Sequence, residues 1–260
     1  TVPESSDFNV GTGDFTIEVS FYYSSTPPTG SGYDYIWGFG PSTTAGLGLY
    51  VQGGIAKIYN GSAVVVSTST VNAFEWTTIA IVRSGTTLSL YKNGTREATA
   101  TVSSDITGTG NNVSIGRWNG VSGGHEDFHG YVTNFRFVNG TAVRAGSSYA
   151  LPTETLTAIT NTKFLLGRLP YFKDQSTSNH AITVVGNVSL EAKSAFDNAP
   201  YSEADHGASV KIESSGSNRL TSPITAMGTG DFTISGWVYT IGSNNPDIIF
   251  DTRPISADAS

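Results

Sequence analysis

A glycoside hydrolase of an all-β fold needs at least two carboxylates on one face of a sheet. A retaining enzyme holds them about 5–5.5 Å apart, and side chains share a face of a strand when they stand two residues apart. The nearest acidic pair in this chain, Glu126-Asp127, is adjacent, so the two side chains would point to opposite faces. Glu18 stands alone in the middle of the alternating stretch 14–23. The sequence therefore disfavours a hydrolase and predicts that the protein is not an enzyme.

Sugar binding is the chemistry that the loop 117–130, RWNGVSGGHEDFHG, favours, because it places an aromatic ring among polar groups between two predicted strands. An exposed tryptophan can stack on a sugar ring, while amides and carboxylates hydrogen-bond its hydroxyls. The other interpretation, which we favour for the tryptophan, is that it closes one end of the core and the polar residues form an ordinary loop. The candidate glycan-binding residues are Trp118, Asn119, His125, Glu126 and Asp127.

Calcium is the one metal for which the chain offers a ligand-rich stretch. Residues 173–180, KDQSTSNH, could supply Asp174, Asn179 and backbone carbonyls. Calcium sites usually gather more carboxylates than this, so an aspartate that caps its own turn is the favoured interpretation. The chain has no cysteine, which excludes disulfides, zinc-thiolate sites and thiol catalysis. We therefore expect no cofactor, with calcium at 173–180 as the alternative.

Short strands must position these groups. In 14–23, DFTIEVSFYY, apolar and polar residues alternate strictly, which predicts a strand with one buried face. In 76–102, two strands and a hairpin are expected, and the Asn93-Gly94 pair supplies the positive φ angles of a two-residue turn.

The second half of the first domain is less regular. The stretch 141–160 is weakly patterned, so we expect a short helical turn or a covering loop there. Trp37, Trp76 and Trp237 lie in strand patterns and are predicted to be core residues. The late strands are expected at KFLL, 163–166, and HAITVVGNVSL, 180–190.

An internal repeat organises the chain. GTGDFTI occurs at 11–17 and again at 228–234, an offset of 217 residues that is too long for a solenoid or propeller unit. The repeated object is therefore a whole domain, and we expect the chain to be a segment of a longer tandem protein. The expected domains are 1–200, a jelly roll, and 205–260, the N-terminal part of a second, incomplete repeat.

Composition excludes several classes of partner. The chain of 260 residues has only 14 Lys and Arg and a net charge of −7, and its basic residues are scattered singly. No basic stripe could follow a phosphate backbone, so nucleic acid is not an expected partner. No run approaches 18 apolar residues, so no membrane span is expected. Many short strands separated by turns predict an all-β fold, an antiparallel two-sheet jelly-roll sandwich.

Three stretches resemble concanavalin A-like and laminin-G-like jelly rolls. GTGDFTIEVSFYY is similar to their early strand, WTTIAIVRSGTTLSLYKNGTREA to their central hairpin, and NNVSIGRW with FHGYVTNFRFVNGTAV to their closing strands. Together they cover about residues 10–145 in the expected order. Residues 156–190 resemble the segment that comes directly after such domains in large tandem structural proteins of bacteriophages, particularly marine cyanophages.

The resemblance implies two antiparallel sheets and a role in adhesion. Many relatives bind glycans, often with calcium at the sheet rim, and others only build structural stalks. Fold alone does not choose among these roles.

We predict a non-catalytic adhesion or structural module of a virion, tail fibre or extracellular appendage that binds a glycan or host-surface receptor. One alternative is a purely structural assembly module that contacts other copies of the chain or other virion proteins. In that case strands at 208–213 and 231–240 would complete a neighbouring molecule or the first domain itself. The other alternative, which is disfavoured, is a glycoside hydrolase of concanavalin A-like fold.

Overall fold

The computed structural model of the chain describes residues 1–42, 45–60, 63–106, 111–118, 127–167, 172–190 and 195–196. The chain divides into two units, Thr1–His206 and Gly207–Ser260. The described residues all belong to the first unit. The predicted second repeat, 205–260, and Trp237 lie outside them, so that part of the domain prediction stays a prediction.

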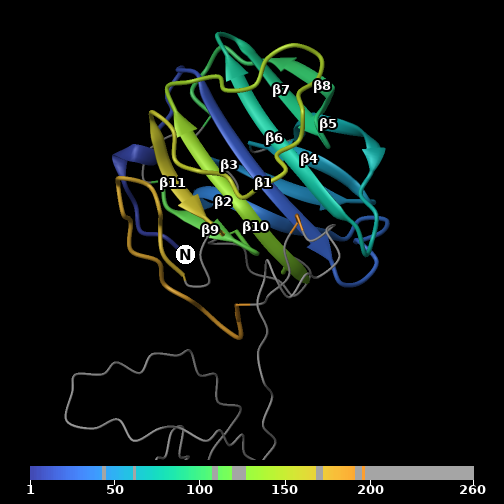
Figure 1. The fold of residues 1–260 in the computed structure, drawn as a ribbon. Helices are drawn as coiled ribbons and strands as arrows, with labels where there is room; N and C mark the ends of the chain where they lie inside the picture. The colour runs from blue at the N-terminus through green and yellow to red at the C-terminus, as the bar shows by residue number, and fades with distance from the viewer. Residues whose placement is uncertain are drawn as a thin grey trace, which may run out of the picture. The chain divides into compact units, whose positions relative to one another are not determined.

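Two antiparallel sheets face each other across one core (Figure 1). Within the described residues the larger sheet has six strands in the order β11-β10-β1-β6-β7-β8 and the smaller has five in the order β5-β4-β3-β2-β9. The all-β sandwich is therefore confirmed. The larger sheet comprises β1 (Phe15–Tyr23), β6 (Trp76–Ser84), β7 (Thr87–Lys92), β8 (Thr95–Thr101), β10 (Gly130–Asn139) and β11 (Thr162–Leu166). The smaller comprises β2 (Tyr33–Ser42), β3 (Ala45–Gln52), β4 (Ile55–Tyr59), β5 (Ala63–Thr70) and β9 (Val113–Ile115).

The core lies between the sheets and is rich in aromatic rings. On β1, Phe15, Ile17 and Phe21 are buried on the inward face, as the alternation predicts. Trp37 on β2 is fully buried, so its predicted core role is confirmed. The 3-10 turn η1 (Ser6–Phe8) adds the ring of Phe8, which packs against rings of both sheets.

The outward face of β1 is also buried, which corrects the prediction of one buried face. Thr16, Glu18 and Ser20 are each at most 2% exposed. The segment 141–160 crosses this face of the larger sheet and covers it (Figure 1). The Thr16 hydroxyl donates to the Thr141 carbonyl at 2.9 Å and accepts from the Val143 N–H at 2.8 Å. The segment is the covering loop that the sequence allowed, and it forms no helix in the described residues.

The hairpin β7–β8 has the predicted turn. Asn93 and Gly94 have φ angles of 47° and 81° and connect two paired strands. The predicted late strand KFLL is β11, but 180–190 forms no strand. Thr183 exchanges two backbone hydrogen bonds with Thr1. Ile182 packs against the core, whereas the valines beyond Thr183 face solvent.

Trp76 departs from its predicted core role, because its ring is half-buried at the start of β6. The outward neighbours of Trp76 are the aromatic residues Tyr22 and, beyond it, Tyr131.

A carboxylate closes the edge of the smaller sheet at β5. Glu97 on β8 accepts hydrogen bonds from the N–H groups of Thr68 and Ser69 at 2.9 and 3.2 Å and from the hydroxyls of Ser67 and Ser69. Unpaired N–H groups on an edge strand can form hydrogen bonds with a strand of another chain. Here one side chain of the opposite sheet uses them, so β5 is tied to β8.

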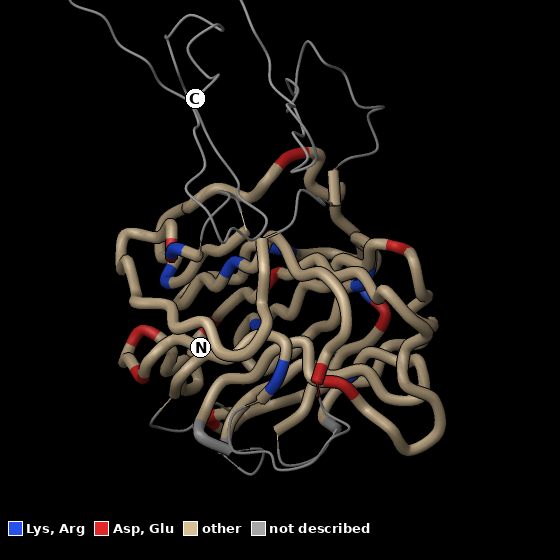
Figure 2. Tube along the Cα trace, turned by 90° about the horizontal axis from the view of Figure 1, so that it is seen from below, with Lys and Arg blue, Asp and Glu red and all other residues tan. Residues whose placement is uncertain are grey.

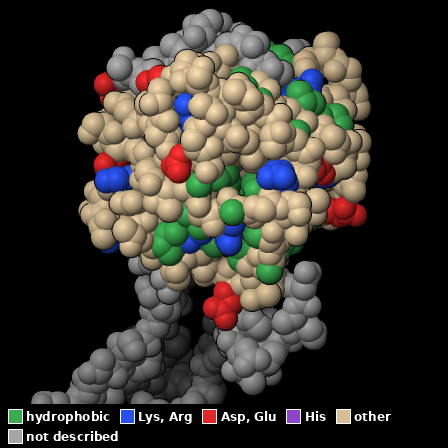
Figure 3. Space-filling view, turned by 90° about the horizontal axis from the view of Figure 1, so that it is seen from above, with side chains coloured by type: hydrophobic (Ala, Val, Ile, Leu, Met, Phe, Trp, Pro, Cys, Tyr) green, Lys and Arg blue, Asp and Glu red, His purple; other side chains and the backbone are tan. Residues whose placement is uncertain are grey.

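Charges are dispersed over the surface of the first unit. Lys and Arg positions are interspersed with Asp and Glu positions along the trace (Figure 2). Seen from above, small patches of hydrophobic side chains lie between positively and negatively charged side chains (Figure 3). In the described part of the chain no helix is long and apolar enough to cross a membrane.

Replacing the Glu97 carboxylate, which binds the edge of β5, is expected to destabilise the first unit in a pH-dependent way. Burial tends to raise the pKa of Glu97, but hydrogen bonds from Ser67, Ser69 and Thr68 outweigh it and lower the pKa below its ordinary value. Glu97 therefore contributes stability above an unfolded-state pKa of about 4.3, and the contribution is lost as the pH falls through the folded-state pKa. At pH 7, Glu97→Gln should lower the unfolding free energy by about 1–2 kcal/mol.

Thermal and urea unfolding at pH 7 and pH 3 measures this effect, with the exposed Glu154→Gln as the matched control. The gap between Glu97→Gln and wild type should be smaller at pH 3 than at pH 7, because the contribution of the carboxylate declines as the pH falls towards its folded-state pKa. A gap of equal size at both values would show that the carboxylate charge plays no part.

Candidate functional site

Trp118 is a buried residue, not an exposed platform. Its ring is 0% exposed and lies across Gly38, Gly46 and Gly48 on the outer face of the smaller sheet. A Cβ at Gly38 or Gly48 would come within 2.5 Å of the ring, so only glycine fits there. The indole N–H donates to the Gly40 carbonyl at 3.1 Å. A ring enclosed in this way cannot stack on a sugar, so this part of the glycan-site prediction is corrected.

The other predicted loop residues are only partly described. Asn119, His125 and Glu126 lie outside the described residues, and a role for them in glycan binding stays a prediction. Asp127 is exposed and forms an ion pair of 2.9 Å with Arg117. Asp127 also bridges in parallel to Tyr35 of β2. Arg117 and Asp127 thus join the two ends of the loop at the border of the smaller sheet.

Four tyrosines surround Trp118 on the outer face of the smaller sheet. Tyr35 packs edge-on against Trp118 with ring centroids 5.1 Å apart, and Tyr59 does so at 6.1 Å. Tyr50 lies between Tyr35 and Tyr59, at 5.6 Å from each. Tyr33 completes the group at 5.7 Å from Tyr35. The tyrosine face is defined here as Tyr33, Tyr35, Tyr50 and Tyr59 together with Trp118, which packs edge-on against Tyr35 and Tyr59.

The tyrosine face is graded from buried to exposed. Trp118, Tyr35 and Tyr50 are 0%, 4% and 7% exposed, whereas Tyr33 and Tyr59 are half-buried. Burial, followed by the neighbouring Tyr59 hydroxyl, raises the pKa of Tyr50 above its ordinary value. Tyr50 is therefore a neutral donor and acceptor at pH 7.

Polar groups stand among these rings. The ammonium group of Lys57 lies 5.8 Å from the centre of the Tyr50 ring and donates to Gln52 Oε1 at 2.8 Å. The amide of Gln52 donates in turn to the Ser31 carbonyl at 3.2 Å. Half-buried rings flanked by a fixed amide, an ammonium and the Arg117–Asp127 pair provide both stacking and hydrogen bonding.

The sequence missed the four tyrosines because each is an ordinary strand residue when read alone. What distinguishes them in the sequence is their position on the outward-facing side of the strands. On β3 and β4 the inward residues are Leu49, Val51, Ala56 and Ile58, and the tyrosines occupy the alternate, outward positions. An outward face on an antiparallel sheet is usually polar, so aromatic residues there indicate either a second packing layer or a ligand.

Glu18, the only acidic residue of β1, has a structural role. Its carboxylate pairs with Arg136 through two nitrogens and with Arg144 at 2.7 Å, and its side chain is 3% exposed. Both guanidinium groups lie under or within the covering segment. A carboxylate enclosed by two cations cannot reach a substrate, so Glu18 offers no catalytic acid or base.

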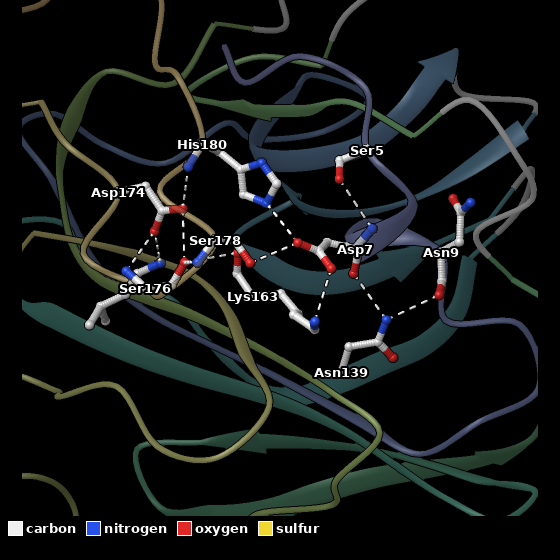
Figure 4. Close-up of polar contacts among 10 residues, drawn as sticks. Ser5, Asp7, Asn9, Asn139, Lys163, Asp174, Ser176, Ser178 and His180 are labelled. Atoms are coloured by element: carbon white, nitrogen blue, oxygen red, sulfur yellow. Dashed lines mark hydrogen bonds and ion pairs between the residues drawn. The ribbon is translucent and has the colours of Figure 1, made fainter.

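Asp174 has the geometry of the capping interpretation rather than that of an open calcium ligand. Its side chain is 1% exposed, and its two oxygens accept four hydrogen bonds (Figure 4). The donors are the N–H groups of Leu165, Ser176 and His180 and the hydroxyl of Ser176, at 2.8–3.0 Å. One donor, Leu165, belongs to β11, so this carboxylate also occupies the outer edge of the larger sheet.

A second acidic residue, Asp7, joins the N-terminus to the same loop (Figure 4). Its carboxylate contacts Lys163 at 2.9 Å, the hydroxyl of Ser178 at 2.7 Å and His180 Nε2 at 3.2 Å. The serine hydroxyl donates to the aspartate rather than to the histidine, so the trio is not a nucleophile–base pair. The described residues hold no group of three or more His, Asp or Glu that could bind a metal ion.

The electrostatics of Asp7 fit a structural clasp. Burial tends to raise its pKa, but Ser178, Lys163 and His180 together lower it below the ordinary value. The ring of His180 also packs on Phe8, with centroids 4.7 Å apart. The loop 172–183 is thus fastened over η1, beside the core.

Comparison with known proteins agrees with this fold. A model of the concanavalin A-like lectin/glucanases superfamily matches residues 1–145. No curated protein matches the chain.

Among solved structures, a candidate carbohydrate-binding protein from Bacteroides ovatus is similar, with a TM-score of 0.51 and 14% identity. The match covers 69% of this chain and 54% of that one, so the chain spans about half the length of that protein. Two others are less similar. Domains LG4-5 of the mouse laminin alpha1 chain have a TM-score of 0.41 at 16% identity, covering 58% of this chain and 46% of that one. Domain 4 of an extracellular arabinanase from Geobacillus stearothermophilus, solved with arabinotriose, has 0.39 at 14%, covering 54% and 66%.

Asp174→Asn is expected to lower the unfolding free energy by about 2–3 kcal/mol, because an asparagine nitrogen cannot accept the bonds from Ser176 and His180. Because protein donors already occupy the carboxylate, a chelator should leave the melting temperature of the wild type unchanged.

Differential scanning calorimetry with and without EDTA measures both effects, with the exposed Glu4→Gln as control. A melting temperature that falls in EDTA and recovers with calcium would establish a calcium site and contradict the capping role.

Proposed function

The chain belongs to the concanavalin A-like lectin/glucanases superfamily, and from that premise we propose that its first unit is a non-catalytic glycan-binding module. The tyrosine face is the proposed binding surface. One observation carries the proposal: half-buried Tyr33 and Tyr59 stand on an outward sheet face, on a rigid base of buried rings. A rigid aromatic surface loses little conformational entropy when a ligand docks on it.

The chemistry of the face suits a sugar. The aromatic rings match the C–H face of a pyranose, and the Gln52 amide, the tyrosine hydroxyls and the Arg117–Asp127 pair match its hydroxyls. The predicted loop residues Asn119, His125 and Glu126 belong to the same loop as Arg117 and Asp127, and we retain them as candidate contacts. Trp118 supports the face from below.

A non-catalytic role is supported by the state of the acids. Glu18 is enclosed by two arginines, and Asp127 is paired with Arg117. The Bacteroides ovatus protein is a candidate carbohydrate-binding protein, which supports glycan as the class of ligand. Its identity of 14% is too low to say which glycan. An extracellular location is part of the proposal, because it suits a glycan ligand.

We further propose that the module belongs to a virion appendage such as a tail fibre, where it recognises a host surface. The support is the recurrence of GTGDFTI at 11–17 and 228–234, which fits a tandem array of such modules. Repetition raises avidity when several weak sites reach one surface.

An assembly role is the second candidate, and one observation favours it. Val184, Val185, Val188 and Leu190 are between 42% and 65% exposed, which gathers four large apolar side chains within seven residues. Exposed apolar clusters of this kind often mark contacts between proteins. Such a role would appear as a discrete oligomer in light scattering.

Tyr33→Ala and Tyr59→Ala should each weaken glycan binding about tenfold, which corresponds to about 1.4 kcal/mol. The half-buried positions allow truncation without loss of the fold. Binding is first located on a panel of oligosaccharides and then measured by titration calorimetry on the best ligand.

Leu151→Ala, which removes an exposed apolar side chain from the covering segment, is the control and should bind as wild type. Trp118→Ala is a poor probe, since it empties a packed layer. Unchanged affinity in both tyrosine variants would remove the tyrosine face from the proposal.

A further inference from the structure

A second aromatic surface lies on the other sheet. Tyr131, Tyr22 and Trp76 stand directly opposite one another across β10, β1 and β6, which are adjacent strands (Figure 1). Their ring centroids are 5.8 and 5.6 Å apart, and all three side chains are half-buried. The aromatic row is defined here as these three residues.

The row occupies the end of the outer face that lies beyond the contacts of the covering segment. That segment bonds to Thr16 and pairs with Glu18 near the start of β1. The next outward positions are Ser20, which bonds to Thr78 at 2.8 Å, and then Tyr22. Aromatic residues therefore begin where polar contacts with the covering segment end.

Phe74 provides an independent observation at the same place. It is 64% exposed and its φ angle is 62°, in the left-handed region that bulky residues rarely adopt. Its N–H donates to the Tyr23 carbonyl at 3.0 Å, which fixes its backbone beside the row. Strain of this kind persists where the surroundings impose it, and it gathers at ligand sites. Folding alone gives no reason to hold a large apolar side chain in water in this conformation.

Hydrogen-bonding groups accompany the rings. Asn72 and Glu75 are exposed in the same loop, and the Asn72 amide donates to Glu75 Oε2 at 3.0 Å. The combination of aromatic faces with an amide and a carboxylate, and without a basic cluster, fits a polyhydroxylated ring rather than a phosphate or an acidic peptide.

We propose that the aromatic row with Phe74 is a second glycan-binding site that engages a sugar by stacking. The ligand class rests on the proposed function, whereas the site is separate, because it lies on the larger sheet and the tyrosine face lies on the smaller. Two sites on opposite sheets allow one module to bind two glycan chains and so to gain avidity.

A pair of variants separates binding from stability. Phe74→Ala and Phe74→Gly both remove the ring, and each should weaken oligosaccharide binding at this site about tenfold. Glycine tolerates the left-handed backbone, so Phe74→Gly should melt about 2–4 °C above Phe74→Ala. Equal loss of affinity with unequal stability would show that the ring itself makes the contact.

The experiment titrates the full chain with the best oligosaccharide of the panel, in wild type, both Phe74 variants, Trp76→Ala and the double variant Tyr33→Ala/Tyr59→Ala. We expect two sites in wild type. The three row variants, Phe74→Ala, Phe74→Gly and Trp76→Ala, should each weaken the site at the aromatic row about tenfold and leave the other site unchanged, and the double tyrosine variant should weaken only the site at the tyrosine face. Loss confined to the row variants would support this site and contradict the proposed tyrosine face.

Full affinity and unchanged stoichiometry in Phe74→Ala, Phe74→Gly and Trp76→Ala would overturn the second site and leave the proposed function standing. Absence of binding in wild type to every oligosaccharide would overturn both. A change in solution mass on Phe74→Ala, with sugar binding intact, would show that the row contacts a protein chain and would also overturn the inference.

Discussion

Satisfying the free N–H groups at the sheet edges is the constraint on which the rest of this sandwich depends. Two carboxylates do this at opposite ends of the fold. Glu97 takes the N–H groups of Thr68 and Ser69 at β5, and Asp174 takes that of Leu165 at β11. At β9, Val2 supplies a short backbone pairing with Val113. The start of β8, the fourth edge strand, pairs with the covering segment at Thr95 and Arg96. These contacts reduce the backbone that another chain could pair with in the described part of the first unit, so recognition by side chains on the outer faces is favoured.

The outer faces of the two sheets are covered to different extents, and the aromatic parts that stay accessible are the candidate binding surfaces. The covering segment 141–160 buries the part of the larger face that holds the Glu18 ion pairs and leaves the aromatic row half-buried at one end of β1. The smaller face carries tyrosines beside Trp118, whose ring needs the glycines at 38 and 48 beneath it. Both surfaces are aromatic, rigid and accompanied by amides and carboxylates, which suits a ligand with an apolar face and a polar edge.

Sequence patterns predicted the elements that depend on local rules. The strand at β1 and the Asn93-Gly94 turn depend on local patterns, and both were predicted correctly, whereas the burial of the outward face of β1 was not. Burial that depends on distant segments was not predictable. Trp118 is buried because glycines some 70 to 80 positions earlier leave room for it, and Trp76 is half-exposed because the covering segment does not extend over it. The apolar run at 180–190 has a strand-like composition, yet it forms no strand.

The most direct test of glycan recognition by the outer faces is a titration of the isotope-labelled chain with the best oligosaccharide, monitored by amide NMR. Shift changes should concentrate at Tyr33, Gln52, Lys57 and Tyr59, with a second group around Tyr22, Phe74 and Trp76. Changes confined to the edges near Asp174 and Glu97, with both aromatic surfaces silent, would contradict recognition through the outer faces.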